Sequence, residues 1–208
     1  MNRSIIKICG LTEPENIREV IELRPDLIGL IFYSSSPRYV SHPEKLAFLH
    51  GPGRMVRTIG VFVNPTHEEI MKTAAAVHLD GIQLHGNETP EFCRNIRSEG
   101  FKVVKSFGVN RNFDFNTTLQ YDRMADYFLF DTGSPKYGGS GEQFDWSLLA
   151  GYHGDTPFLL SGGLSPEMQV FPVHPHFAGV DLNSRFEIFP GIKDTRLLQK
   201  FIKQFRDE

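Results

Sequence analysis

Short apolar segments alternate with helical patterns along nearly the whole chain, and this alternation constrains the fold more than any other feature of the sequence. Segment 26–33, D-L-I-G-L-I-F-Y, is almost continuously apolar, as in a strand that is buried on both faces of a sheet. Between such segments, apolar residues recur at helical spacing. Strands are predicted at residues 4–9, 26–33, 55–63, 80–84, 101–107, 127–130, 156–160 and 177–182.

The number of strands indicates a closed barrel. Closing a sheet removes its edges, and eight strands in 208 residues fit a (β/α)8 TIM barrel near its minimum size. A doubly wound open sheet is the alternative, but it more often has five or six strands and a glycine fingerprint after the first, where this chain has C-G-L-T. We therefore predict an α/β protein with one domain, residues 1–208, folded as a single TIM barrel.

The predicted helices follow the strands in order, with one exception. Helical patterns cover residues 13–23, 43–50, 89–97, 145–150 and 195–205, a further helix starts at 64–66, and a weaker one covers 113–123. Between the seventh and eighth strands, Pro166, Pro172 and Pro175 leave room only for a short helix at about 165–170. This connection is predicted to be shortened and irregular.

Composition and charge exclude several kinds of partner. The chain is 40% hydrophobic and 23% charged, and its formal net charge of −3 gives no basic field for nucleic acid or an anionic membrane surface. No apolar run approaches the roughly 20 residues of a membrane span, and residues 1–6 show no signal-peptide pattern. Cys9 and Cys93 are the only cysteines and lack metal-ligand spacing, so neither a zinc site nor a disulfide framework is indicated. We expect a cytoplasmic protein.

Polar and reactive side chains stand where the predicted strands end, which in a TIM barrel is the face that carries the active site. Period-two alternation places Cys9 on the same strand face as Lys7, and Asp131 on the same face as Leu129. If these faces point inward, a thiol and a carboxyl lie across one mouth. The candidates at this end are Cys9, Arg38, His85, Asp131, Ser161, Gly162, Gly163, Asp181, Asn183 and Ser184.

A glycine-rich loop follows Asp131 and continues to Phe144. It is longer than the about four to six residues of most connections, and such loops are often functional lids. A mobile cover at residues 135–141 above a fixed acid is one interpretation. The other is a solvated surface loop whose aspartate caps the next turn.

Seven motifs, in order from the first to the eighth predicted strand, together resemble the phosphoribosylanthranilate isomerases of tryptophan biosynthesis. They are K-I-C-G-L-T, S-P-R-Y-V, I-G-V-F-V-N, Q-L-H-G-N-E, F-D-T with G-G-S-G-E-Q-F-D-W, L-S-G-G-L and G-V-D-L-N-S. The resemblance implies an aldose-ketose isomerase for the Amadori rearrangement of N-(5-phosphoribosyl)anthranilate to 1-(2-carboxyphenylamino)-1-deoxyribulose 5-phosphate. It implies a small phosphorylated substrate and no cofactor.

The resemblance also implies that Cys9 is the general base and Asp131 the general acid. A free cysteine has a pKa of about 8.5, so a catalytic thiolate needs a nearby cation, for which Lys7 is the candidate. A buried structural thiol is the alternative for Cys9. The acid needs a raised pKa, which burial beside apolar neighbours provides.

Phosphate binding is assigned to residues 161–163 and 183–184, because glycines let backbone N–H groups approach an anion and the loops after the last two strands often form this site. The family usually has Ser-Gly where this chain has Ser184 and Arg185. Arg185 therefore either contacts the phosphate or points to solvent.

Arg38 resembles the residue that binds the anthranilate carboxylate in this family, with a surface ion pair as the alternative. The other expected substrate contacts are Lys7, His85 and Asp181.

Three other functions compete with this interpretation. A metal-dependent hydrolase is suggested by His174 and His176, but Pro175 separates them and they lie in the irregular connection, so no metal is expected. Indoleglycerol-phosphate synthases and ribulose-phosphate epimerases fit the phosphate loops but not C-G after the first strand or F-D-T. A non-catalytic barrel is disfavoured by the presence of both Cys9 and Asp131. The expected assembly is a monomer or a weak homodimer.

Overall fold

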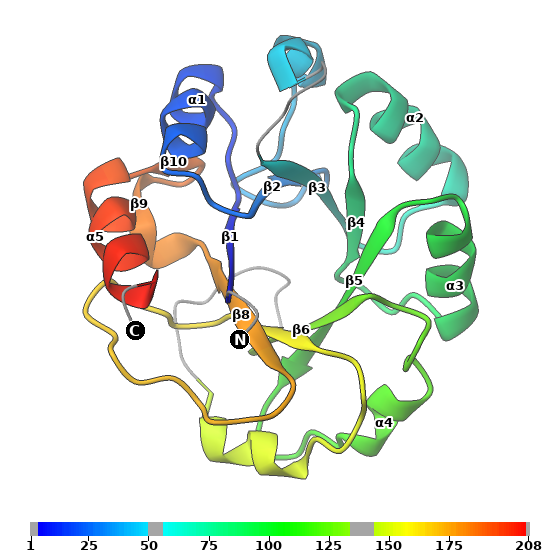
Figure 1. Cartoon of the computed structure of the whole chain (residues 1–208). Coiled ribbons are helices and arrows are strands. Elements are labelled where there is room, and N and C mark those ends of the chain that lie inside the picture. Colours follow the sequence, from blue (N-terminus) through cyan, green and yellow to red (C-terminus); the bar gives the residue numbers. More distant parts are fainter. Residues whose placement is uncertain (1–3, 50–55, 134–143, 207–208) are drawn as a thin grey trace.

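Eight parallel strands close into a barrel in the computed structural model, with helices around it (Figure 1). The structure describes residues 4–49, 56–133 and 144–206. Each strand pairs with the next, and β8 pairs with β1, so the sheet has no edge. The strands are β1 (Ile5–Cys9), β2 (Leu27–Ile31), β3 (Arg57–Phe62), β4 (Gly81–Leu84), β5 (Lys102–Val109), β6 (Tyr127–Thr132), β7 (Phe158–Leu160) and β8 (Phe177–Leu182). The predicted TIM barrel is confirmed.

The helices begin where the sequence carries start signals. Thr66 accepts a hydrogen bond from the Glu69 backbone at the start of α2, and the Glu69 side chain completes a capping box. The α-helices are α1 (Pro14–Glu22), α2 (His67–Val77), α3 (Pro90–Ser98), α4 (Asn116–Leu119) and α5 (Thr195–Arg206), and the 3-10 helices are η1 (Pro43–Leu49), η2 (Trp146–Gly151) and η3 (Ser184–Phe186). The segments predicted as helices at 43–50 and 145–150 are thus 3-10 helices.

Helix α4 is much shorter than the predicted segment 113–123. The hydroxyls of Thr117 and Thr118 donate to the carbonyls of Asp114 and Phe115, each at 2.7 Å. Such local bonds compete with helix propagation, and β-branched residues lower helix propensity.

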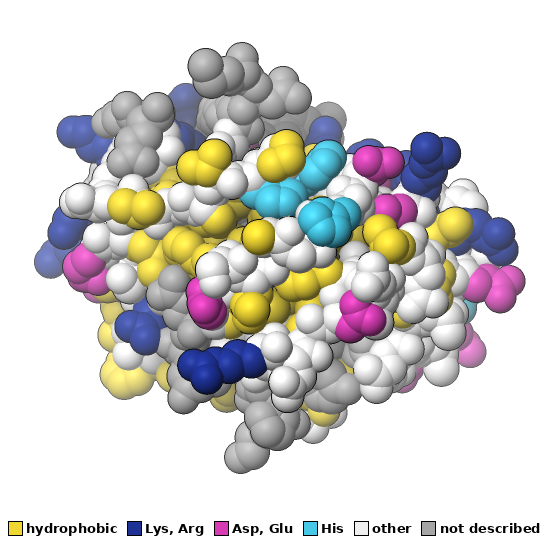
Figure 2. All heavy atoms as spheres, turned by 90° about the horizontal axis from the view of Figure 1, so that it is seen from below, with side chains coloured by type: hydrophobic (Ala, Val, Ile, Leu, Met, Phe, Trp, Pro, Cys, Tyr) yellow, Lys and Arg dark blue, Asp and Glu magenta, His cyan; other side chains and the backbone are white. Residues whose placement is uncertain are grey.

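The connection between β7 and β8 is irregular, as predicted, but the short helix expected at 165–170 does not form. One turn occurs, in which the Met168 backbone N–H donates to the Ser165 carbonyl at 3.1 Å. The Gln204 side chain of α5 donates a hydrogen bond to the Met168 carbonyl. The prolines in this segment prevent a longer helix. Figure 2 shows histidine and hydrophobic side chains gathered on the face that carries η2 and this connection.

A two-stranded antiparallel sheet after β8 was not predicted. It consists of β9 (Glu187–Phe189) and β10 (Ile192–Lys193) and lies beside α1 and α5 in Figure 1. Gly191 has φ 94° in the turn between them, a conformation that favours glycine. The backbone N–H of Thr12, shortly after β1, donates to the Gly191 carbonyl in this turn, and Glu187 and Lys193 of the hairpin pair at 2.7 Å.

The barrel interior has an apolar layer and a polar layer. The apolar layer is formed by Leu27, Ile59, Val104, Leu129 and Leu159, with Ile5 and Tyr127 packed against it. Because side chains alternate along a strand, Lys7 and Cys9 point inward after Ile5, and Asp131 points inward after Leu129. The predicted alternation is therefore correct, and it delivers the thiol and the carboxyl to the same end of the barrel.

Among the described residues, no helix is long and apolar enough to cross a membrane.

Candidate active site

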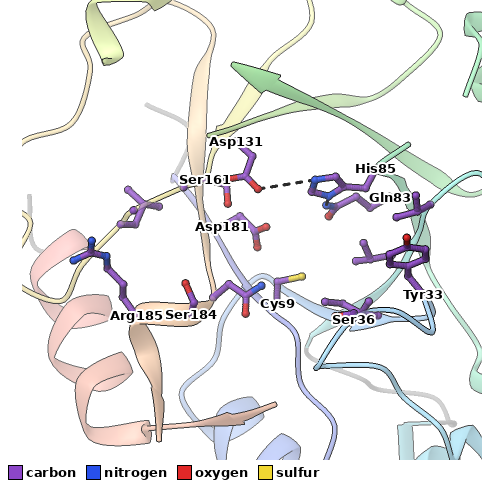
Figure 3. A pocket seen from close by; sticks show the side chains of 17 residues that line it. Cys9, Tyr33, Ser36, Gln83, His85, Asp131, Ser161, Asp181, Ser184 and Arg185 are labelled. Atoms are coloured by element: carbon purple, nitrogen blue, oxygen red, sulfur yellow. Dashed lines mark hydrogen bonds and ion pairs between the residues drawn. The ribbon is translucent and has the colours of Figure 1, made fainter. Parts of the chain in front are cut away.

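A cavity with an empty volume of about 710 Å³ opens at the ends of the strands (Figure 3). Most of the predicted site residues line it. These are Cys9, His85, Asp131, Ser161, Gly162, Gly163, Asp181, Asn183, Ser184 and Arg185. Lys7 and Arg38 do not line it. Other lining residues were not predicted from the sequence: Tyr33, Ser36 and Gln83, and the apolar Ile31, Val61 and Val63.

Asp131, the residue before the last of β6, carries a buried carboxyl. Its side chain accepts a hydrogen bond from the backbone N–H of Thr132 at 2.8 Å, and its Oδ2 lies 3.9 Å from Nε2 of His85. Burial is the main cause that raises the pKa of Asp131, Asp181 adds to the rise, the Thr132 N–H and Lys7 oppose it, and the net pKa is about 6. The carboxyl therefore carries a proton at a much higher pH than an exposed aspartate.

Cys9 ends β1 and is only 3% exposed. Burial raises the pKa of its thiol, and Lys7 lowers it without reversing the shift. Room for the sulfur comes from Gly29 on β2, where a Cβ atom would lie 2.6 Å from Sγ. Lys7 therefore acts in the predicted direction, but burial outweighs it.

Lys7 and Asp181 form a buried ion pair at the bottom of the cavity, with 2.9 Å between Nζ and Oδ1. Burial lowers the pKa of Lys7, but Asp181 and Cys9 more than reverse this and leave it raised. Burial also raises the pKa of Asp181, against the effect of Lys7. Lys7 lies beneath the cavity and contacts Asp181, which lines it, so a direct substrate contact of Lys7 stays a prediction.

His85 is held between Gln83 and Asp131. Its Nδ1 lies 3.2 Å from Nε2 of Gln83, and the same Gln83 nitrogen donates to Oγ of Ser106 at 3.1 Å. Burial, Lys105 and Lys7 lower the pKa of His85 to about 4. The ring is therefore neutral at physiological pH.

Arg38 is bound by Glu187 rather than exposed. Nε donates to Oε1 at 2.8 Å and Nη2 to Oε2 at 2.7 Å, and Lys193 reaches the same carboxylate at 2.7 Å. Burial lowers the pKa of Lys193 to about 8, although Glu187 opposes this. Arg38 thus forms an ion pair, as in the alternative interpretation, but the pair is buried and not on the surface. A contact of Arg38 with the anthranilate carboxylate stays a prediction.

The end of the cavity next to β7 and β8 suits an anion. Gly162 and Gly163 have φ of 80° and 68°, and successive backbone N–H groups in such turns form anion-binding concavities. Ser184 begins η3, and the exposed side chain of Arg185 lines the same end of the cavity. Figure 3 places Ser184 and Arg185 on one side, Tyr33 on the opposite side, and Cys9 and Asp181 between them.

The predicted lid at 135–141 falls outside the described residues. His174 and His176 contact the aromatic rings of Tyr152 and Phe158 instead of the cavity. Within the described ranges, no group of three or more His, Cys, Asp or Glu residues has an arrangement that could hold a metal ion.

A closed barrel that brings a thiol and a carboxyl to one cavity, with glycines and an arginine at its end, defines a class of protein. It is a TIM-barrel enzyme with a site for acid–base chemistry on a small anionic ligand.

The family is shown by comparison with known proteins. The family model of N-(5′-phosphoribosyl)anthranilate (PRA) isomerase matches residues 6–204. The chain therefore belongs to the PRA isomerase family, and it is an isomerase of tryptophan biosynthesis. The chain is 49% identical over 205 residues to the PRA isomerase of Parabacteroides distasonis, covering 96% of this chain and 92% of the relative.

Solved structures agree with this assignment. A crystal structure of phosphoribosyl anthranilate isomerase from Thermotoga maritima is similar, with a TM-score of 0.82 at 37% identity over 99% of this chain and 100% of that one. A second, with a TM-score of 0.79 and 34% identity over 99% and 100% of the two chains, is a complex with reduced 1-(o-carboxyphenylamino)-1-deoxyribulose 5-phosphate.

Proposed function

We propose that Asp131 and Cys9 perform the two proton transfers by which this isomerase converts PRA to 1-(2-carboxyphenylamino)-1-deoxyribulose 5-phosphate. The observation that carries the proposal is that both side chains face one cavity from β6 and β1, with a glycine-rich anion site at its end. One proton donor, one proton acceptor and the substrate nitrogen are sufficient for the rearrangement. It needs no oxidant, reductant or cofactor.

Asp131 acts first, as the general acid. It donates its proton to the ring oxygen of the ribose, the C1′–O bond breaks, and the nitrogen lone pair forms a C1′=N bond. A pKa of about 6 supports this role, because about one molecule in ten carries the proton at pH 7.

Cys9 then acts as the general base. Its thiolate removes the C2′ proton, the C–H electrons form a C1′=C2′ bond, and the C=N electron pair returns to nitrogen. The resulting enolamine gains a proton at C1′ and releases the proton of its C2′ hydroxyl, so that C2′ becomes the carbonyl carbon of the ketose. Lys7 supports the thiolate, because it lowers the pKa of Cys9 against the effect of burial.

The substrate is oriented by the two ends of the cavity. We assign the phosphate to residues 161–163 and 183–185, where glycines expose the backbone and Arg185 adds a positive charge. The anthranilate ring then lies toward the apolar end formed by Ile31, Val61 and Val63, beside Tyr33. The analogue bound by the structural relative has this division into a phosphate and a carboxyphenyl group.

Arg38 is assigned to the anthranilate carboxylate, although its side chain does not line the cavity in this structure. Glu187 holds the edge of the guanidinium formed by Nε and Nη2, and within the described residues no hydrogen bond from Nη1 is seen. A fixed fork with one remaining edge suits a single carboxylate.

Three broader assignments belong to this proposal. Residues 1–208 form one barrel domain. The assembly is a monomer or a weak homodimer, and sedimentation velocity over a range of concentrations tests this. A homologue from Thermotoga maritima is described as dimeric. A cytoplasmic location stays a prediction of the sequence.

The proposal is tested by turnover of Cys9→Ala and Asp131→Ala, followed by the fluorescence of PRA. We expect kcat to fall about 10²- to 10⁴-fold in each, because each variant loses one proton-transfer group. Thr58→Val is the matched control, since the Thr58 hydroxyl is buried without a hydrogen-bond partner among the described residues. If either active-site variant turns over PRA as fast as this control, the assigned mechanism is wrong.

A further inference from the structure

A row of polar side chains in the barrel interior starts on β5, passes through β4 and the residue after it, and ends at the proposed acid on β6. Ser106 on β5 accepts from Nε2 of Gln83 on β4 at 3.1 Å, and the same nitrogen lies 3.2 Å from Nδ1 of His85. On the other side of the ring, Nε2 of His85 lies 3.9 Å from Oδ2 of Asp131. Gln83 is 1% exposed, so solvent does not compete for these bonds.

The orientation of the Gln83 amide follows from which buried atoms would be left unpaired. In the observed orientation the two N–H groups serve Ser106 and His85, and Oε1 is buried without a partner among the described residues. The reversed orientation would bury an NH₂ group with two unpaired donors instead. Each unsatisfied buried donor costs about 1–3 kcal/mol, so one unpaired carbonyl oxygen is the lower-energy choice.

This orientation determines the tautomer of His85. The ring is neutral, because burial, Lys105 and Lys7 disfavour its cation. A neutral imidazole has one N–H and one lone pair, and Nδ1 must supply the lone pair to accept from Gln83. The remaining hydrogen is therefore on Nε2, which faces Asp131 (Figure 3).

We propose that Gln83 is a positioning residue that holds His85 in the Nε2–H tautomer, so that the imidazole donates toward the reacting oxygen and cannot take the proton of Asp131. The inference rests on the proposed role of Asp131. A direct bond is not formed, because 3.9 Å exceeds hydrogen-bond length. A substrate oxygen that accepts from Nε2–H of His85 can lie against the same carboxyl. With the opposite tautomer, the lone pair on Nε2 would compete with the ring oxygen for the acid's proton.

The first test is the ¹⁵N spectrum of histidine-labelled protein, with the His85 signals assigned by their loss in His85→Asn. We expect neutral His85 with hydrogen on Nε2 and a lone pair on Nδ1 from pH 6 to 8. Wild-type His85 with hydrogen on Nδ1, or as an imidazolium, overturns the inference without any variant at position 83.

The second test is Gln83→Glu, whose carboxylate can only accept from Nδ1. We expect the tautomer to reverse or the ring to become charged, with kcat reduced about tenfold or more and KM changed less than about threefold. A merely structural role of Gln83 would not change the His85 spectrum. Thr58→Val, on the neighbouring strand β3, should keep both the spectrum and kcat of the wild type.

The two proposals fail in different ways. If Asp131→Ala keeps wild-type turnover, the proposed mechanism fails whatever the tautomer of His85. If Asp131→Ala is inactive but Gln83→Glu keeps either the Nε2–H signal or the wild-type kcat, only the role of Gln83 is refuted.

Discussion

Glu187 is the negative centre of a buried cluster behind the active site, and its replacement by glutamine gives a quantitative test of the structure. The carboxylate accepts from Arg38 at 2.7 Å and from Lys193 at 2.7 Å, with only 5% of its side chain exposed. Glu187→Gln keeps the shape but leaves two buried cations without this counter-charge. We expect it to be destabilising, because breaking a buried ion pair on one side costs about 3–5 kcal/mol.

The two cations contribute to this loss in different ways. Lys193 has a pKa of about 8 in the wild type and loses its proton when the carboxylate is removed. Because pH 7 lies one unit below the pKa of Lys193, removing its proton costs about 1.4 kcal/mol at that pH. The lysine therefore contributes at most this amount to the loss of unfolding free energy. Arg38 cannot lose its proton, and its charge-assisted bonds contribute the remaining about 1.5–3 kcal/mol.

The pH dependence separates these two contributions. At pH 9 the wild-type Lys193 is already mostly neutral, so its share of the destabilisation disappears. The difference in unfolding free energy between wild type and Glu187→Gln should therefore be about 1 kcal/mol smaller at pH 9 than at pH 7. The remaining difference reports the lost Arg38 bonds.

Urea unfolding, followed by fluorescence of the only tryptophan, Trp146, measures these free energies. Trp146 stacks on Phe171 with ring centroids 6.2 Å apart, so its signal reports tertiary structure. Glu91→Gln is the matched control, because the Glu91–Arg94 pair is exposed and should contribute less than about 0.5 kcal/mol. If Glu187→Gln is no less stable than this control, or if its effect is the same at both pH values, the assignment of charges in the cluster is wrong.

Two other predictions concern the acid and the base. Because the proposed reaction requires protonated Asp131, with a pKa of about 6, and ionised Cys9, with a raised pKa, kcat/KM should be level between about pH 7 and 9 and fall above the pKa of Cys9. If kcat/KM instead falls tenfold per pH unit from pH 7 upward, ionisation of Cys9 does not offset the deprotonation of Asp131, and the proposed base is wrong. Gly29→Ala should lower kcat and the free energy of unfolding, the latter by about 1–3 kcal/mol, because its Cβ would lie 2.6 Å from Sγ of Cys9 and 3.1 Å from Nζ of Lys7. Steady-state kinetics and urea unfolding measure both, and unchanged values would mean that the sulfur is not confined as described.

The barrel was predictable from local sequence signals. Apolar runs such as 26–33 mark strands buried on both faces, and the alternation of Lys7 with Cys9 fixes which side chains enter the barrel. The segment at 165–170 forms only one turn, in a connection that also contains Pro172 and Pro175. The prediction was less accurate for α4, where two threonine hydroxyls compete with the helix.

Much of the site depends on contacts between distant segments, which the local patterns do not encode. Arg38 meets Glu187 across 149 residues, and Lys7 meets Asp181 across 174. In both pairings the cation has a buried carboxylate partner from a distant segment. Gln83 did carry a usable signal, because it stands two residues before His85 and alternation places both on the inner face.

Asp131 is assigned to opening of the ribose ring and Cys9 to removal of the C2′ proton, and the isotope effect on kcat with PRA deuterated at C2′ distinguishes these two roles. In Cys9→Ala, removal of that proton should become rate-limiting, giving a primary isotope effect well above unity. In Asp131→Asn, ring opening should become rate-limiting, giving an effect close to unity. The opposite pattern, or the same effect in both variants, would contradict the assignment of the two roles.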